Sequence, residues 1–347
     1  MSRETGARRT AKLSWLAVGL MVSAMLILSP DHSSAHPVSA AGPIDRAPVG
    51  TASANVVNGS EPVSWTAVWS GLPDRSFWKS TTALGAGYGG AKRKVVRSYF
   101  RFDTRAFKGK RILGAELNLR QLDAASCRPW LTDVYRTGPV GSRATWRNQP
   151  VRNALQSSSN STMGCDAGYG MVGWDVTEAA RYYARSVTTT ATFLVRARSE
   201  AEPRAWKRFD SSNASLYVTY VSMPDEPTDV AVRTSNASTP CGTEAAPAVV
   251  GSSSVTLAAT LSSADSYSAN LTGVFRRRDT ALTADEEDAL GTQVASGERT
   301  TLPWEVSDGH VYRFQVAARS SWWYEGSADS MDSVFTDWCW FTVDLNG

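Results

Sequence analysis

The chain has 347 residues, enough for two ordinary domains, and a formal net charge of +3. So small a net charge gives no general electrostatic case for binding nucleic acid. The chain contains 13 Trp residues, and Trp serves cores and flat polar ligands equally well, so composition does not decide between packing and binding.

An export signal is predicted for residues 1–40. Basic residues up to Lys12 precede the apolar run from Leu13 to Leu28, and small residues suited to cleavage follow at 33–35 and 38–40. This order is typical of a secretory signal. The alternative is an uncleaved membrane anchor, because the run is nearly long enough to span a bilayer, but no basic stop-transfer cluster follows it. We therefore expect a secreted, extracellular protein, at the cell surface or beyond it.

Four cysteines follow the predicted signal: Cys127, Cys165, Cys241 and Cys339. In an oxidising compartment an even number of cysteines is typical of disulfides. Three pairings are open, and we favour 127 with 165 and 241 with 339, because each pair then stays within one predicted domain. No pair has the CxxC spacing of a metal knuckle. The only His after residue 40 is His310, which we predict to be a turn residue, so zinc held by several His is excluded.

Composition divides the remaining chain. Residues 41–60 are small and polar with scattered Pro and Gly, and they predict a disordered tether. Residues 61–222 predict one domain and residues 230–347 a second. The stretch "MPDEPTD" at 223–229 has two Pro and three acidic residues between strand-like runs, and it predicts a linker.

Alternation of apolar and polar residues dominates 61–222 and is typical of half-buried strands. On one face of each of two strands the alternation places Val96, Ser98, Phe100 and Phe102, and Ala115, Leu117 and Leu119. One short helix is expected, with Thr177 as its N-cap. Many strands, one helix and turn-rich joints predict an all-β domain, a jelly-roll-like β-sandwich.

The strand-like runs "SVTLAATLS", "NLTGVFRRRD", "HVYRFQVAARS" and "WCWFTVDL" predict a second, Ig-like β-sandwich after the linker. The fold class is thus two β-sandwich domains in tandem. The acidic stretch 283–290 is expected to be a single helical turn or a solvated loop, and a loop tip is the simpler choice. Trp322 and Trp323 are adjacent, so on a strand one of them faces outward, toward the neighbouring domain or a protein partner.

Five sequence blocks follow one another between residues 61 and 222: "YFRFDTRAFKGKRILGAELNLRQLDAASC", "VYRTGPVGSRATWRNQP", "GWDVTEAA", "AWKRFD" and "SLYVTY". In order and spacing they resemble the DNRLRE modules of secreted actinobacterial proteins, also classed as carbohydrate-binding module family 96. The resemblance implies a β-sandwich that binds polysaccharide in some members. Through "DGHVYRFQVAARS" and "WCWFTVD", residues 230–347 resemble the Ig-like or fibronectin type III-like modules that follow DNRLRE modules.

The candidate ligand-binding residues lie in two of these blocks and beside them: Trp146, Asn148, Gln149, Trp206, Arg208, Arg128 and Tyr135. An aromatic face suits the C–H bonds of a sugar ring, and amides and Arg suit its hydroxyls. The basic residues would also suit an acidic polysaccharide such as a uronate polymer. The alternative is structural: Trp146 plugs the end of the sandwich while Asn148 and Gln149 bond their own loop.

An enzyme would need a pair of carboxyl groups, and the candidates by residue type are Asp103, Asp133, Asp175, Asp210, Glu200 and Glu202. No G-x-S-x-G motif is present. We expect a non-catalytic protein that binds polysaccharide or a cell-surface glycan. The alternatives are a structural or adhesive scaffold and a polysaccharide-degrading enzyme. We expect no nucleic-acid partner, and membrane contact only through an uncleaved signal.

No cofactor is predicted. A structural calcium ion held by loop oxygens would suit a jelly-roll module, but the sequence gives it no location.

Overall fold

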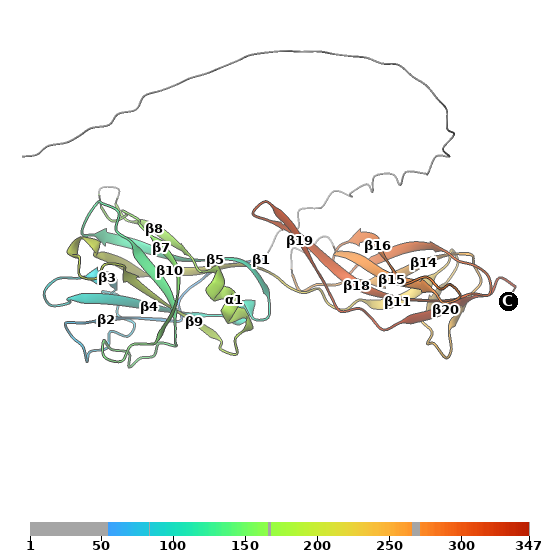
Figure 1. The fold of residues 1–347 in the computed structure, drawn as a ribbon, viewed down its shortest axis with the longest axis horizontal. Coiled ribbons are helices and arrows are strands. Elements are labelled where there is room, and N and C mark those ends of the chain that lie inside the picture. The colour runs from blue at the N-terminus through green and yellow to red at the C-terminus, as the bar shows by residue number, and fades with distance from the viewer. Residues whose placement is uncertain (1–54, 83, 166–167, 266–270, 347) are drawn as a thin grey trace, which may run out of the picture. The chain divides into compact units, whose positions relative to one another are not determined.

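The computed structural model describes residues 55–82, 84–165, 168–265 and 271–346. The predicted export signal, and the predicted tether as far as residue 54, lie outside the described residues. The prediction of a disordered tether is wrong for residues 55–60, which form a strand paired with residues 216–220. The described fold is all-β, as predicted (Figure 1). Contacts group Pro48–Gly347 into a single unit, so the division into two domains at 223–229 stays a prediction.

Ten strands precede that stretch: β1 (Asn55–Ser60), β2 (Ser64–Trp69), β3 (Gly85–Tyr88), β4 (Val95–Asp103), β5 (Arg111–Ala124), β6 (Thr132–Thr137), β7 (Arg152–Ser159), β8 (Gly170–Asp175), β9 (Thr190–Ala197) and β10 (Lys207–Val221). Helix α1 (Thr177–Arg185) and the 3₁₀ turns η1 (Arg105–Phe107) and η2 (Pro203–Ala205) lie among them. We call strands β1–β10 the N-terminal sandwich.

The N-terminal sandwich consists of two sheets, and strand β3 connects them. One sheet has the order β10-β5-β8, with β1 also paired to β10. The other has the order β7-β6-β9-β4, with β2 also paired to β4. Strand β3 pairs with both β4 and β10. The inner faces meet in one apolar core that includes Phe100, Leu117 and Phe193, and burial of this apolar surface drives the packing.

The predicted alternation is confirmed in both strands that define it. The inward side chains of β4 and β5 are buried: Val96, Ser98, Phe100 and Phe102, and Ala115, Leu117 and Leu119. Ser98 is polar but satisfied, because its hydroxyl bonds both the N–H and the C=O of Gly85 at 2.8 Å.

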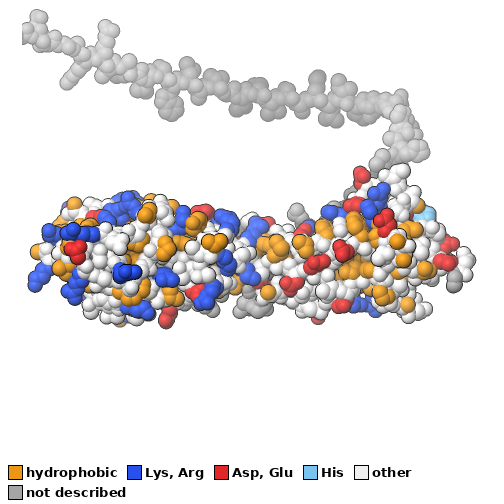
Figure 2. All heavy atoms as spheres, turned by 90° about the horizontal axis from the view of Figure 1, so that it is seen from below, with side chains coloured by type: hydrophobic (Ala, Val, Ile, Leu, Met, Phe, Trp, Pro, Cys, Tyr) orange, Lys and Arg blue, Asp and Glu red, His pale blue; other side chains and the backbone are white. Residues whose placement is uncertain are grey.

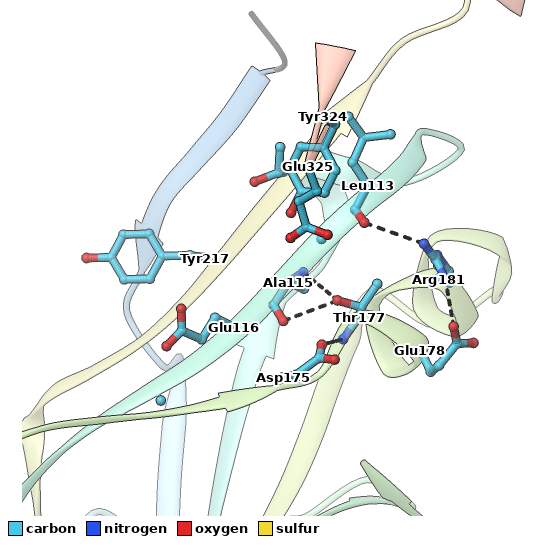
Figure 3. Close-up of a pocket in the computed structure, with 13 residues that line it drawn as sticks. Leu113, Ala115, Glu116, Asp175, Thr177, Glu178, Arg181, Tyr217, Tyr324 and Glu325 are labelled. Atoms are coloured by element: carbon cyan, nitrogen blue, oxygen red, sulfur yellow. Dashed lines mark hydrogen bonds and ion pairs between the residues drawn. The ribbon is translucent and has the colours of Figure 1, made fainter. Parts of the chain in front are cut away.

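The predicted cap of the helix is wrong. Val176 precedes helix α1 as the N-cap residue, and no side chain caps it there. The hydroxyl of Thr177 instead accepts a hydrogen bond from the Ala115 N–H at 2.9 Å, while Asp175 Oδ1 accepts one from the Thr177 N–H at 2.9 Å (Figure 3). Thr177 therefore anchors the helix to strand β5. Asp175 accepts the hydrogen bond from the first backbone N–H of the helix.

Ten more strands follow: β11 (Thr228–Arg233), β12 (Ser238–Pro240), β13 (Ala248–Val250), β14 (Ser254–Thr260), β15 (Leu271–Asp279), β16 (Glu287–Val294), β17 (Arg299–Glu305), β18 (Val311–Tyr324), β19 (Ser327–Asp332) and β20 (Cys339–Val343). We call these the C-terminal sandwich. Its sheets have the orders β12-β11-β14-β17 and β13-β20-β18-β15-β16, with β19 paired to β18. The two sheets share a core that contains Leu257, Phe275 and Phe341.

The acidic stretch 283–290 was predicted as a loop tip, and this is wrong for its second half. Strand β16 begins at Glu287, because Arg277 and Arg276 of β15 pair with Glu287 and Asp288 at 3.1 and 2.8 Å. Opposite charges on facing strands thus stabilise the pairing.

Both predicted disulfides are confirmed. Cys127 is bonded to Cys165, with a Cα–Cα distance of 5.5 Å, and Cys241 is bonded to Cys339, with a distance of 4.8 Å. Disulfides indicate an oxidising compartment. Among the described residues, no helix is both long and apolar enough to cross a membrane.

Candidate ligand-binding site

The candidate site lies on the outer face of the sheet that contains β4 and β9. The alternation that buries Phe100 points Arg97 and Tyr99 to the opposite face, beside Leu194 of β9. Residues 138–151 fold back over this face, where Val140 and Ala144 are buried in a satellite apolar cluster. This segment is therefore fixed to the sheet by apolar contact.

Gln149 is the centre of the hydrogen bonding there. Its side-chain oxygen accepts hydrogen bonds from Arg97 Nη1 and from the Tyr99 hydroxyl, both at 3.0 Å. Its side-chain nitrogen donates to the carbonyl oxygen of Trp146 at 2.7 Å. We define the Gln149 surface as Arg97, Tyr99, Gln149, Pro150, Arg152 and Leu194, which line one depression of about 320 Å³.

The charges around Gln149 leave an excess of cations. Glu200 accepts two hydrogen bonds from Arg97, at 2.7 and 2.8 Å, and pairs with Arg196 at 2.9 Å. The hydrogen bonds that Arg97 donates to Glu200 raise the pKa of Arg97. Burial raises the pKa of Tyr99 to about 12, so its hydroxyl stays a neutral donor at physiological pH.

Arg152 contributes the uncommitted charge. It is exposed, and its guanidinium lies 4.9 Å from the centre of the Tyr135 ring. It forms no ion pair within the part of the chain that the structure describes. A second depression of about 310 Å³ adjoins the first. It is lined by Pro139, Gly141, Ser142, Arg143, Ala144, Asn148, Gln149 and Pro150. Gln149 and Pro150 belong to both depressions, and each is near the lower end of the size range of ligand pockets.

Four of the seven predicted ligand residues meet here. Tyr135, Trp146, Asn148 and Gln149 all lie at or beside the Gln149 surface. Trp146 is half-buried, and the guanidinium of Arg97 lies 4.6 Å from the centre of its ring. One face of this Trp is thus occupied by the protein, whereas Asn148 is exposed and free to turn toward a ligand.

The other three predicted residues belong to a different part of the sandwich. Trp206 packs over strand β3, where a Cβ atom at Gly85 would lie 2.2 Å from its ring. Arg208 is exposed, 3.9 Å from Asp123, and Arg128 is exposed in the segment after β5. No contact links these three to Gln149 among the described residues. Lys207 and Phe209, which alternate with Trp206 and Arg208 along the chain, are buried.

Sequence reasoning missed Arg97, Tyr99 and Arg152, and it named Glu200 only as a candidate catalytic carboxyl group. The signal for the first two was present, because the alternation that identifies the core of β4 also identifies its outward residues. Nothing in the sequence could place Glu200 beside Arg97, since 103 positions separate them.

The carboxyl groups considered for catalysis are mostly bound to Arg. The pairs are Asp103 with Arg105, Asp133 with Arg198, Asp210 with Arg120, Glu200 with Arg97, and Glu202 with Arg204. Hydrogen bonds from Arg204 lower the pKa of Glu202 to about 2, and a hydrogen bond from Arg105 lowers that of Asp103. A general acid needs a raised pKa, so these two carboxyls are tuned in the opposite direction.

The described residues contain no cluster of metal-ligand side chains. No group of three or more His, Cys, Asp or Glu residues could hold a metal ion in the described ranges, so the calcium prediction gains no location. His310 lies in the turn before β18, with Nδ1 2.8 Å from Asp279 Oδ2.

No protein-family model matches the chain, and a comparison with curated proteins finds no relative. The DNRLRE assignment therefore stays a prediction. Solved structures give distant likenesses. The CBM22-1-CBM22-2 tandem domain of Paenibacillus barcinonensis Xyn10C is 11% identical, with a TM-score of 0.24, over 85% of this chain and 100% of that one.

Two glycosidase structures are similarly distant. A calcium-binding mutant of Bacteroides uniformis β-glucuronidase 2 is 14% identical, with a TM-score of 0.22, over 80% of this chain and 32% of that one. A GH2 β-galacturonidase from Eisenbergiella tayi, bound to galacturonate, is 6% identical with a TM-score of 0.22, over 81% and 42%. This chain thus spans about a third of the glucuronidase, and at these TM-scores the likenesses carry no argument about ligand or activity.

Proposed function

We propose that this is a secreted, non-catalytic protein of the DNRLRE type that binds an acidic polysaccharide through the Gln149 surface. The observation that carries the proposal is a pair of adjoining depressions whose rim holds uncommitted donors, Arg152 and Asn148, around a rigid network. A guanidinium matches the two oxygens of a uronate carboxylate, and amides bond sugar hydroxyls. The disulfides and the predicted export signal support an extracellular site of action.

The distribution of charge supports an acidic ligand. Residues 55–221 contain 24 Lys and Arg against 12 Asp and Glu, a net charge of +12. Lys and Arg side chains are widespread over the N-terminal sandwich, on the left of Figure 2. A cationic module raises the local concentration of a polyanion and speeds its binding.

The test is affinity electrophoresis of residues 41–347 in gels that contain polygalacturonate, alginate or a neutral glucan. The uronate polymers should retard the protein, and Arg152→Gln should weaken that retardation about threefold to tenfold, because one charge-assisted contact is lost. Arg185→Gln is the matched control: it removes one exposed positive charge from the end of helix α1 and should leave retardation nearly unchanged.

Two outcomes would contradict the proposal. Equal retardation by double-stranded DNA would reduce the surface to a general polyanion site. No retardation by either uronate polymer would favour a structural or adhesive scaffold. One observation supports that alternative, since Gln149, Arg97 and Glu200 already satisfy one another without a ligand.

A further inference from the structure

A second polar surface lies on the outer face of the other sheet of the N-terminal sandwich. Tyr217 of β10 is the register partner of Glu116 of β5, which in turn is the partner of Asp175 of β8. All three are exposed, while their chain neighbours Leu117, Trp174 and Val218 are buried. Figure 3 shows Tyr217, Glu116 and Asp175 on the same side of these neighbouring strands.

A glycine draws the oxygen atoms of this surface together. Asn118 and Gly173 are register partners, one step along the strands from Glu116 and Asp175. A Cβ atom at Gly173 would lie 1.7 Å from Glu116 Oε1 and 3.0 Å from Asn118 Oδ1. Both side chains therefore lean over Gly173 and occupy space that any other residue would fill.

The two carboxylates lack the Arg partners that most other acidic residues of this sandwich have. Neither Glu116 nor Asp175 forms an ion pair with any described residue, although basic residues outnumber acidic ones two to one here. The Arg drawn in Figure 3, Arg181, is bound to Glu178 at 2.7 Å and to the Leu113 carbonyl at 3.4 Å. Like charges opposite one another on paired strands cost stability, so this arrangement needs an explanation beyond folding.

We propose that Tyr217, Glu116, Asn118 and Asp175 form a second sugar-binding surface, specific for a neutral glycan. Tyr217 is 40% exposed, and a tyrosine ring offers a flat apolar face to a sugar ring. Ionised carboxylates only accept hydrogen bonds, and they suit vicinal hydroxyls, which donate. The same carboxylates repel a uronate, so this surface selects against the ligand proposed for the Gln149 surface.

The test is affinity electrophoresis of residues 41–347 in a neutral β-glucan, a xylan and a mannan, each with and without EDTA. At least one polymer should retard the wild-type protein, with EDTA having no effect. Tyr217→Ala should weaken binding at least about fivefold, whereas Tyr217→Phe should retain it because the ring remains. Glu116→Gln should weaken binding with the fold intact, which circular dichroism would check.

Arg152→Gln is the matched control for the other surface. It should leave retardation by neutral polymers unchanged, and Tyr217→Ala should leave retardation by uronates unchanged, so either surface can fail alone. Retardation by no neutral polymer, or equal retardation of Tyr217→Ala and wild type, would overturn the inference. Retardation that EDTA abolishes and calcium restores would also overturn it, because the oxygen atoms would then serve a cation.

Discussion

The buried residue Lys207 makes the stability of the N-terminal sandwich depend on pH in the alkaline range. Its side chain faces inward with Phe209 and is only 3% exposed. Its ammonium donates a hydrogen bond to the carbonyl oxygen of Ser161. Burial lowers the pKa of Lys207 to about 8, because a low-dielectric environment penalises the charged form.

The sign of the pH effect follows from linkage. In the unfolded chain Lys207 has a pKa of about 10.4, so between pH 8 and pH 10 the unfolded state binds a proton that the folded state lacks. The free energy of unfolding therefore rises with pH in this window, and the gain is lost as pH falls toward 8. We expect the Lys207 contribution to increase by about 2 kcal/mol between pH 7.5 and pH 9.5.

Lys207→Met isolates this contribution. The free energy of unfolding of both proteins should be measured with urea at several pH values from 7.5 to 9.5. As pH rises, the free energy of unfolding of the wild type should increase relative to that of the variant. Staying below pH 10 avoids Tyr99, whose raised pKa destabilises the folded state at higher pH. Parallel pH profiles for the two proteins would refute the assignment.

At the scale of elements, the sequence predicts those features of the strands that depend on the alternation of apolar and polar residues. The inward residues of β4 and β5, both disulfide pairs and the all-β class follow from period-two patterns and cysteine positions. The path of residues 138–151 does not, because contacts with Tyr99 and Leu194 determine it and both lie far away in the sequence. For the same reason Trp146 could be identified as important, but not as a residue already covered on one face by Arg97.

The same elements make a prediction about how that segment is held. Glu200 pairs with both Arg97 and Arg196, and its side chain is 14% exposed. Glu200→Gln would leave two half-buried guanidinium groups without their carboxylate. We expect the free energy of unfolding to fall by about 2 kcal/mol, between the values for exposed and fully buried pairs. Amide hydrogen exchange in residues 141–149 should become faster, since Arg97 also holds Gln149.

Glu202→Gln is the control for this experiment. Glu202 pairs with Arg204 at 2.7 Å in the same connection between β9 and β10, but its partner is 57% exposed. Solvent screens such a pair, so urea unfolding should show no measurable change. A loss of stability in Glu202→Gln as large as in Glu200→Gln would mean that any charge change in this connection destabilises the protein, and the specific role of Glu200 would be wrong.

At the scale of the whole chain, the small net charge conceals an asymmetry. Residues 222–347 contain 7 Lys and Arg against 18 Asp and Glu, a net charge of −11, while residues 55–221 carry +12. The expectation from a net charge of +3 therefore does not apply to either part. A polyanion is attracted to the first part and repelled by the second, which restricts an acidic polysaccharide to the N-terminal sandwich.

The two proposed surfaces differ in local charge, since Arg152 lies at the Gln149 surface and Glu116 and Asp175 lie beside Tyr217, and this difference separates them by their response to salt. Binding to polygalacturonate at the Gln149 surface is electrostatic, so raising NaCl from 50 to 500 mM should weaken it on the order of tenfold. Binding to a neutral glycan at Tyr217 depends on ring contact and hydrogen bonds and should change little. Isothermal titration calorimetry of residues 41–347 with both ligands at the two salt concentrations checks this. Equal salt dependence for both ligands would mean that they share one surface, because only a cationic site responds so strongly to screening.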